Sequence, residues 1–363
     1  MNKKIMTILG PIQEGELGWT SMHEHILMDG RVLHEKWREK LRVPPPVDPD
    51  MPMSIENVGF ISHNGMATYD AVDLRDEHLM TQEAADFKAA GGESMVECSA
   101  IGIRCDIQGV RRIAEANGIH VVGCTGFYAE ESLPRRYLGL SAAEYAAVMI
   151  DEVDHGMEGT DMYPGVLKIA INNFTRTEEN TLRATGRAAA ETGLSITLHC
   201  CWKPGADPVA AIKILKEEGA DPTRVVIAHV GGSFVESDLR ALVTRPDESW
   251  RLKLDSVRRI LDLGANICTE FLGQNLADDL TGYVGTTDWH RLAGLYALIR
   301  EGYAGQIVLG TDTCCKMLTR RFGGEGYLRL WNFVIPTMRN ILDIPNRVIE
   351  KIFVENPARI LAY

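Results

Sequence analysis

The stretch GVLKIAINNFTRTEENTLRATGRAAAETGLSITLHC, residues 165–200, contains one complete strand–helix–strand unit. Its two ends, 165–171 and 195–200, are short runs rich in apolar and β-branched residues, which is typical of buried strands. The segment between them has an Ala/Leu stripe over 179–193 and stops at Gly193, which predicts a helix. Two strands joined by a helical crossover are expected to be parallel.

The same alternation recurs along the rest of the chain. Further strand-like runs lie at 19–25, 93–99, 120–126, 224–230, 265–271 and 306–312, and helical patterns lie at 110–118, 207–220, 255–265 and 289–303. From the second strand onward the spacing is about thirty residues, the size of one βα unit. The eight strands therefore predict an α/β fold, a (β/α)8 TIM barrel. The alternative is an open doubly wound sheet, but no G-x-G-x-x-G motif follows the first strand.

The length of 363 residues suits one such barrel as a single domain, 1–363. Its longest irregular segment is 29–80, which includes VPPPVDPDMPM (43–53). Closely spaced prolines prevent regular structure there. We expect a loop excursion after strand one that folds over one end of the barrel; the alternative is a surface elaboration with no part in the chemistry.

Composition excludes several classes of protein. The chain is 45% hydrophobic and 24% charged, with a net charge of -12, which argues against general nucleic-acid binding. The sequence contains no run of about 18 apolar residues, so no membrane span is expected. The N-terminus lacks the apolar core of a signal peptide. The cysteines lie mostly in apolar runs without C-x-x-C spacing, so reduced thiols in a cytoplasmic protein are expected.

Six polar side chains lie where the predicted strands run or end. They are His23 and His25 (strand one), Lys168 (strand four), His199 (strand five), His229 (strand six) and Asp312 (strand eight). Singly, each has an ordinary explanation: a core histidine with a partner, a lysine that reaches outward, or an aspartate that caps a helix. Active sites of barrels gather at the C-terminal ends of the strands, so together these six residues could hold two divalent metals.

Lys168 is the exception in this set, because an ammonium group does not bind a cation. It lies between Leu167 and Ile169, and burial among apolar residues disfavours the charged form of a lysine. A neutral lysine amine can react with carbon dioxide. The resulting carbamate is an anionic oxygen ligand that can bridge two metals.

This set of ligands resembles that of the amidohydrolase superfamily. The surrounding sequence is similar to the phosphotriesterase family in five places: LGWTSMHEH (17–25), GIRCD (102–106), CTGFY (124–128), RRFGGEGY (320–327) and ENPARILAY (355–363). The resemblance covers nearly the whole chain and implies a binuclear metal centre. By this resemblance the more buried metal would be held by His23, His25 and Asp312, the more exposed one by His199 and His229, and both would be bridged by carboxylated Lys168.

The resemblance also implies a mechanism. Zinc is the expected metal, although such N/O sites also accept manganese, cobalt or iron. The metals would generate a bridging hydroxide and polarise the C=O or P=O group that it attacks. Asp312 would take the proton of the hydroxide and pass it to the leaving group. Tyr128 would donate a hydrogen bond near the metals; the alternative is a packing aromatic.

The sequence departs from the lactonase members of the family at two positions. Phe271 stands where they tend to carry an arginine, and Gly232 stands where some relatives have an aspartate. We therefore expect a metal-dependent hydrolase of a carboxylic amide or of an ester or lactone, with phosphotriesterase activity as a side reaction. The alternatives are a lactonase or phosphotriesterase as the main activity, or a non-catalytic relative that binds metal or ligand.

The expected partner is a small-molecule substrate, with neither nucleic acid nor membrane involved, and the chain is expected to form a homodimer. Several cations lie in the loops that would build the pocket: Arg104, Arg135, Arg136, Lys203, Lys316, Arg320 and Arg321. Two or three of them facing the metals would bind an anionic group on the substrate. The alternative is that they pair with loop carboxylates or hold the loops in shape.

Overall fold

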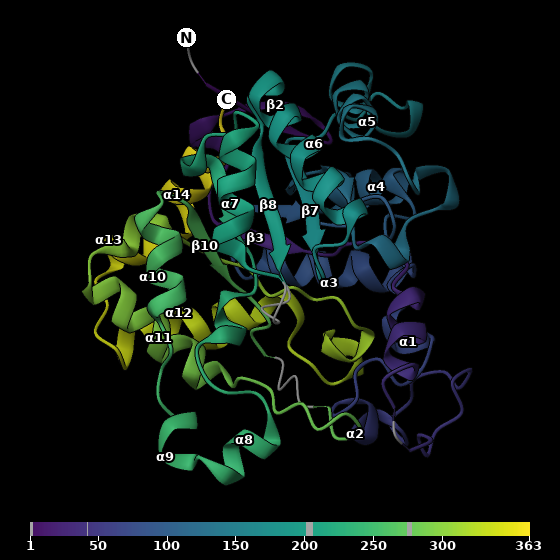
Figure 1. The fold of residues 1–363 in the computed structure, drawn as a ribbon, viewed down its shortest axis with the longest axis vertical. Coiled ribbons are helices and arrows are strands. Elements are labelled where there is room, and N and C mark those ends of the chain that lie inside the picture. Colours follow the sequence, from purple (N-terminus) through teal and green to yellow (C-terminus); the bar gives the residue numbers. More distant parts are fainter. Residues whose placement is uncertain (1–2, 42, 201–205, 274–277) are drawn as a thin grey trace.

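The computed structural model describes residues 3–41, 43–200, 206–273 and 278–363. Its centre consists of parallel strands with helices around them (Figure 1). One sheet has six strands in the order β11-β10-β9-β8-β7-β6, and a second has three in the order β3-β4-β5. Their bounds are β3 Thr20–Glu24, β4 Ser94–Glu97, β5 His120–Val122, β6 Cys124–Phe127, β7 Val166–Ile171, β8 Ser195–Cys200, β9 Val225–Ile227, β10 Asn266–Thr269 and β11 Ile307–Leu309. A short antiparallel pair, β1 Lys4–Thr7 and β2 Gly10–Gln13, precedes them.

The run 120–126, predicted as one strand, forms two. The structure divides it at Gly123 into β5, which pairs with β4, and β6, which pairs with β7. This segment therefore joins the two sheets. A β-carbon at Gly123 would lie 3.0 Å from Ile8, so the absence of a side chain lets the chain pass close to its N-terminal segment.

The two remaining sheet edges, β11 and β3, lie against each other. The backbone N–H of Asp312, just after β11, donates to the carbonyl of His23 in β3 at 3.0 Å. Gly310 permits this approach, because an added β-carbon would stand 2.6 Å from the same carbonyl oxygen. The parallel α/β arrangement, with its first and last strands in contact, is consistent with the predicted (β/α)8 barrel.

Helices follow the strands in the predicted order. Those of the first half are α1 Arg31–Arg38, α2 Val58–Ile61, α3 Glu77–Ala89, α4 Ile107–Asn117, α5 Ala142–His155, α6 Arg176–Thr192 and α7 Pro208–Glu217. Those of the second half are α8 Leu239–Thr244, α9 Pro246–Ser249, α10 Asp255–Asp262, α11 Asp288–Arg300, α12 Ile335–Asn340, α13 Asn346–Glu350 and α14 Asn356–Leu361. A capping box between Thr175 and Glu178 starts α6, and left-handed Gly193 ends it. None of the helices in the described ranges is long and apolar enough to cross a membrane.

The interior between the strands is filled by small side chains. Val96, Val122, Val226, Cys268 and Val308, one from each of five strands, are all buried together there. Such a layered interior of branched and small residues leaves no channel, so chemistry must occur at an end of the strands. The seven cysteines within the described ranges are free thiols.

Segment 29–80 is less irregular than predicted, because it contains α1 and α2. Its proline-rich part, 43–57, has neither helix nor strand. The segment is tied to loops after the last strands: Trp37 Nε1 donates to Asp278 at 2.6 Å, and Lys316 forms an ion pair with Asp70. In Figure 1 the arrows of β7 and β8 point toward the half of the molecule that carries α1, α2, α8 and α9.

Candidate metal centre

The structure brings the six predicted ligands together from five strands. His23 lies in β3 with His25 directly after it, Lys168 lies in β7, His199 in β8, His229 follows β9, and Asp312 follows β11. Five of them are buried, and His199 is half-buried. Residues up to 289 positions apart in the sequence, His23 and Asp312, therefore meet at one end of the strands because parallel strands share their C-terminal edge.

One half of the centre consists of His23, His25 and Asp312. Their ligand atoms all lie within 4.8 Å of one another. His25 Nε2 is 3.2 Å from Asp312 Oδ1, and His23 Nε2 is 3.9 Å from the same oxygen. Two imidazole nitrogens and a carboxylate oxygen that converge in this way form a donor set suited to a divalent metal.

The other half consists of His199 and His229. Their ring nitrogens Nδ1 and Nε2 lie 2.8 Å apart, and Asp312 Oδ2 is 3.7 Å from Nδ1 of His229. Lys168 Nζ lies 2.9 Å from His23 Nε2. Asp312 thus faces both halves, and Lys168 reaches the histidine of the first strand.

The protonation states of these groups fit a metal site. Burial, followed by the charge of Lys168 and the neighbouring histidines, holds the pKa of His23 well below its ordinary value, so its imidazole is neutral, the form that binds metals. Burial opposes ionisation of Asp312, but the hydrogen bond to His25 and the nearby cations bring its pKa below its ordinary value. Within the described ranges, the buried Nδ1 of His229 has no hydrogen-bond partner, as expected for a nitrogen reserved for a ligand.

Lys168 is fully buried. Among the described residues it forms no ion pair with a carboxylate, and its Nζ contacts the Nε2 nitrogen of His23. An unpaired buried ammonium is costly.

Two partners of the histidines were not found from the sequence. Glu270, after β10, is fully buried; it accepts a hydrogen bond from His23 Nδ1 at 2.9 Å and one from the backbone N–H of His229 at 2.6 Å. Ser99 Oγ lies 2.8 Å from His25 Nδ1. Both contacts leave Nε2 of each histidine facing the centre. The only sequence signal for Glu270 was its position at the end of a strand.

Glu270 also forms a possible ligand group of its own with His23 and His229, within 4.8 Å. We favour the orienting role, because Glu270 contacts the Nδ1 side of His23 whereas Nε2 faces Lys168 and Asp312. A carboxylate only accepts, so this contact places the proton of the neutral imidazole on Nδ1 and leaves the lone pair on Nε2.

Three strand ends at the centre have unusual backbone conformations. His229, Phe271 and Asp312 have φ values of 62°, 59° and 52°. This left-handed region is unfavourable for residues with a side chain, and such strain gathers at functional sites. The turn after each strand thereby aims its side chain into the centre.

Two aromatic rings border the His199–His229 pair. Tyr128, after β6, is tilted against His199 with ring centroids 5.3 Å apart. Phe271 stacks on His229 with centroids 4.6 Å apart and an interplanar angle of 18°. The predicted tyrosine therefore lies beside the centre, and Phe271 forms an apolar wall next to His229.

Most of the predicted loop cations have carboxylate partners. Arg104 pairs with Glu152, Lys316 with Asp70, Arg320 with Asp86, and Arg321 with Glu83 and Asp86. These contacts favour the alternative in which such cations hold loops in shape. Arg135 and Arg136 are exposed, and Lys203 lies outside the described residues.

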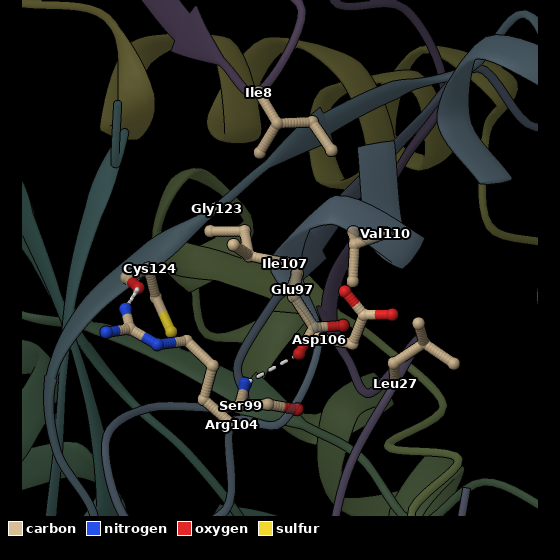
Figure 2. A pocket seen from close by; sticks show the side chains of 10 residues that line it. All are labelled: Ile8, Leu27, Glu97, Ser99, Arg104, Asp106, Ile107, Val110, Gly123 and Cys124. Atoms are coloured by element: carbon tan, nitrogen blue, oxygen red, sulfur yellow. Dashed lines mark hydrogen bonds between the residues drawn. The ribbon is translucent and has the colours of Figure 1, made fainter. Parts of the chain in front are cut away.

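A small cavity of about 20 Å³ is lined by Glu97, Ser99, Arg104 and Asp106 among others (Figure 2). Glu97 accepts a hydrogen bond from the Ser99 N–H at 2.7 Å, and burial raises its pKa. This volume holds about one water molecule. The cavity is therefore too small for a substrate, and one of its lining residues, Ser99, contacts His25.

Comparisons with known proteins agree with this geometry. The model of the phosphotriesterase family matches residues 3–361. An N-acetyltaurine hydrolase from Rattus norvegicus is 28% identical over 370 residues, which cover 100% of this chain and 99% of the relative. The crystal structure of a resiniferatoxin-binding protein from Rhodobacter sphaeroides is 28% identical, covers 99% of this chain and 94% of its own, and superposes with a TM-score of 0.85. A phosphotriesterase homology protein from Escherichia coli, at 23% identity, 95% and 99% coverage and a TM-score of 0.73, shares the fold.

Proposed function

Because this chain belongs to the phosphotriesterase family and is a metal-dependent hydrolase, we propose that it uses two metals to cleave the carboxylic amide of a small N-acyl compound. The observation that carries the proposal is the convergence of four histidines, Lys168 and Asp312 from five strands. The amide is favoured over a lactone or phosphotriester by the N-acetyltaurine hydrolases, which match the chain over its full length, and by Phe271 in place of the lactonase arginine.

The proposed roles follow from the positions of the side chains. His23, His25 and Asp312 would hold one divalent metal, and His199 and His229 the other, with Lys168 between them. Metals held by these residues would lower the pKa of a water molecule and polarise the scissile carbonyl. We propose zinc, with manganese, cobalt or iron as alternatives.

Asp312 would move the proton. Its carboxylate faces both halves of the centre, so it can accept the proton of the attacking water and deliver it to the nitrogen of the departing amine. An amine leaves readily only when it is protonated, so this transfer is required for amide cleavage. Tyr128, beside His199, would donate a hydrogen bond to the substrate carbonyl.

Carboxylation of Lys168 is the part of the proposal that can be tested by spectroscopy. Its burial and its lack of a carboxylate partner in the described ranges support it. Metal-reconstituted protein prepared with ¹³C-bicarbonate should show a carbamate carbon signal that the Lys168→Met variant lacks. A free amine in fully metal-loaded protein would contradict carboxylation.

The substrate is proposed to carry an anionic group on the amine side, as N-acetyltaurine does. The N-acetyltaurine hydrolases that match this chain support this proposal. The loop cations support it less, because four of the seven already have carboxylate partners. A charge-assisted contact of about 1.5–3 kcal/mol should give N-acyl amino acids or N-acyl taurine about a tenfold or greater kcat/KM over their neutral analogues.

We further propose that residues 1–363 form one hydrolase domain in which segment 29–80 borders the substrate. The segment contacts the loops after β10 and β11 through Trp37–Asp278 and Lys316–Asp70, which are the loops at the C-terminal ends of the strands. A homodimer is the proposed assembly, which light scattering would test.

The deciding experiment is a hydrolysis screen with metal-reconstituted protein. N-acetyltaurine, N-acetyl amino acids, a lactone, an aryl ester and a phosphotriester would be compared by kcat/KM, with metal content measured on the same sample. The proposal expects about two metal equivalents, chelator-sensitive turnover and a preference for an amide. A tenfold preference for the lactone or phosphotriester would contradict it, and metal binding without any hydrolysis would favour a binding role.

A further inference from the structure

Glu24 stands between the two histidines of the first strand, yet its side chain faces away from the metal centre. Alternation along β3 turns it toward the seam between β3 and the end of β11. It is fully buried there. A buried carboxylate is costly unless several donors satisfy it, so its contacts should reveal its purpose.

Those contacts lie on both sides of Asp312. One oxygen of Glu24 accepts from the Thr311 N–H at 2.8 Å and from the Ser21 hydroxyl. The other accepts from the Thr311 hydroxyl at 2.6 Å and from the Thr313 N–H at 3.2 Å. The N–H between these two peptides, that of Asp312, donates to the carbonyl of His23 at 3.0 Å. Residues 23 and 24 thus hold three consecutive peptide groups of the strand-eight turn.

This turn is the place where Asp312 adopts a φ of 52°. A left-handed non-glycine residue persists only where its surroundings determine the conformation. We propose that Glu24 is a positioning residue, which holds the peptides on either side of Asp312 so that its carboxylate faces both halves of the metal centre. This inference rests on the proposed function, because it assumes the ligand and proton-transfer roles of Asp312.

A carboxylate suits this position better than an amide of the same shape. All four groups that point at Glu24 are donors, and each oxygen accepts two of them. Glutamine would replace one acceptor oxygen by an NH2 group and turn its hydrogens toward donors. Glu24→Gln should therefore lose the hydrogen bonds on one side of the turn, to Thr311 or to Thr313, with little change in side-chain volume.

The test compares Glu24→Gln with Ser21→Ala in the full-length protein. Ser21→Ala also removes a hydrogen bond to Glu24 but leaves the strand-eight peptides in place. Metal affinity would be measured by competition with a chromogenic chelator, together with kcat, KM and the unfolding temperature. Glu24→Gln should lower metal affinity and kcat by about tenfold or more, with KM nearly unchanged, whereas Ser21→Ala should stay close to wild type.

A purely structural role would give a different result. Glu24→Gln would then lower only the unfolding temperature. Well below that temperature, its metal affinity and kcat would equal those of Ser21→Ala, and this outcome overturns the inference. If Glu24→Gln does not fold, the inference is tested with Thr311→Val, which removes one hydroxyl contact to Glu24. The inference is supported if Thr311→Val binds metal more weakly than wild type and Thr311→Ser, which keeps the hydroxyl, binds it normally. Wild-type metal affinity in Thr311→Val overturns the inference.

The metal readout also separates this inference from the proposed function. Wild-type protein that binds no metal would overturn the proposed function and this inference with it. Wild-type protein that binds two metals, together with an unaffected Glu24→Gln variant, would overturn only the role of Glu24.

Discussion

Asp312 is the residue on which most of the proposed chemistry depends. Its two oxygens face different histidines, with Oδ1 3.2 Å from His25 Nε2 and Oδ2 3.7 Å from His229 Nδ1. Its backbone is strained, and its carboxyl pKa lies below the ordinary value in spite of burial. A side chain held in this way can serve as a ligand and as a proton acceptor in the same site.

Replacement of Asp312 by asparagine should separate these two roles. Asparagine retains an oxygen ligand but cannot accept a proton, so kcat should fall by about 10²-fold or more while metal content changes little. Asp312→Ala, the matched control, should lose metal as well as turnover. Turnover of Asp312→Asn within a few-fold of wild type would show that Asp312 is not the proton acceptor.

Phe271 should determine which acyl groups the site accepts. Its ring stacks on His229 and forms a wall beside the centre. Phe271→Ala should raise the kcat/KM of N-hexanoyl substrates relative to N-acetyl substrates by about tenfold, because a hydrophobic pocket discriminates one methylene group by about 1–3 kcal/mol. Phe271→Tyr, which keeps the ring, should retain the wild-type preference. An unchanged acyl preference in Phe271→Ala would place the wall elsewhere.

At the scale of elements, the loops that follow the strands are held by ion pairs. Arg104, after β4, pairs with Glu152 of α5 and with Glu158, and its side chain is only 8% exposed. Glu152 also accepts from Thr125 Oγ1 at 2.5 Å. The loop after β4 is thereby fixed to α5.

Removal of Arg104 should therefore affect stability more than chemistry. Arg104→Met leaves Glu152 buried without its ion-pair partner, which costs about 3 kcal/mol or more. Urea unfolding should show this loss, and it should be smaller in the double variant with Glu152→Met, which leaves no unpaired charge. Lys36→Met, at an exposed pair with Glu39, is the control and should leave the midpoint unchanged. Equal losses in the single and double variants would contradict the pairing argument.

At the scale of the whole molecule, the proposed centre joins strands from both ends of the chain. Its residues come from β3 near the N-terminus, from β7 to β9, and from the end of β11. The N-terminal and C-terminal segments also pair directly, through Lys4 and Tyr363. Metal bound at this point would hold together parts of the chain that separate on unfolding.

Removal of the metal should therefore lower global stability as well as stop turnover. A ligand that binds only the folded state stabilises it by about 4 kcal/mol at a thousand times its dissociation constant. Chelator-treated protein should unfold at a clearly lower temperature than reconstituted protein in differential scanning fluorimetry, and added zinc should restore it. The same unfolding temperature with and without metal would contradict a centre built from these strands.

Much of the fold was predictable because its signals are local. The stretch 165–200 shows strand, helix and strand by periodicity and by its terminating glycine, and β7, α6 and β8 form there. The division of 120–126 into β5 and β6 could not be read in the same way. It depends on which neighbour each half pairs with, and pairing partners lie far apart in the sequence.

In the candidate site, too, one part was predictable from the sequence and another part was not. The meeting of the six predicted ligands followed from their places on five of the parallel strands, because parallel strands end at a common edge. Their roles as ligands stay predictions. The six are His23, His25, Lys168, His199, His229 and Asp312. The supports of these side chains were decided only by the tertiary structure. Glu270 lies 247 residues from His23, and Thr311 lies 287 residues from Glu24.

The loop cations show the same limit. The sequence by itself determined that they lie after the strands, but the structure pairs Arg104 with Glu152, and Arg321 with Glu83 and Asp86. Periodicity and burial act on neighbouring residues, so a single sequence expresses them directly. Hydrogen bonds and ion pairs act only over a few ångströms in space, so their partners exist only once the strands and helices have been brought together.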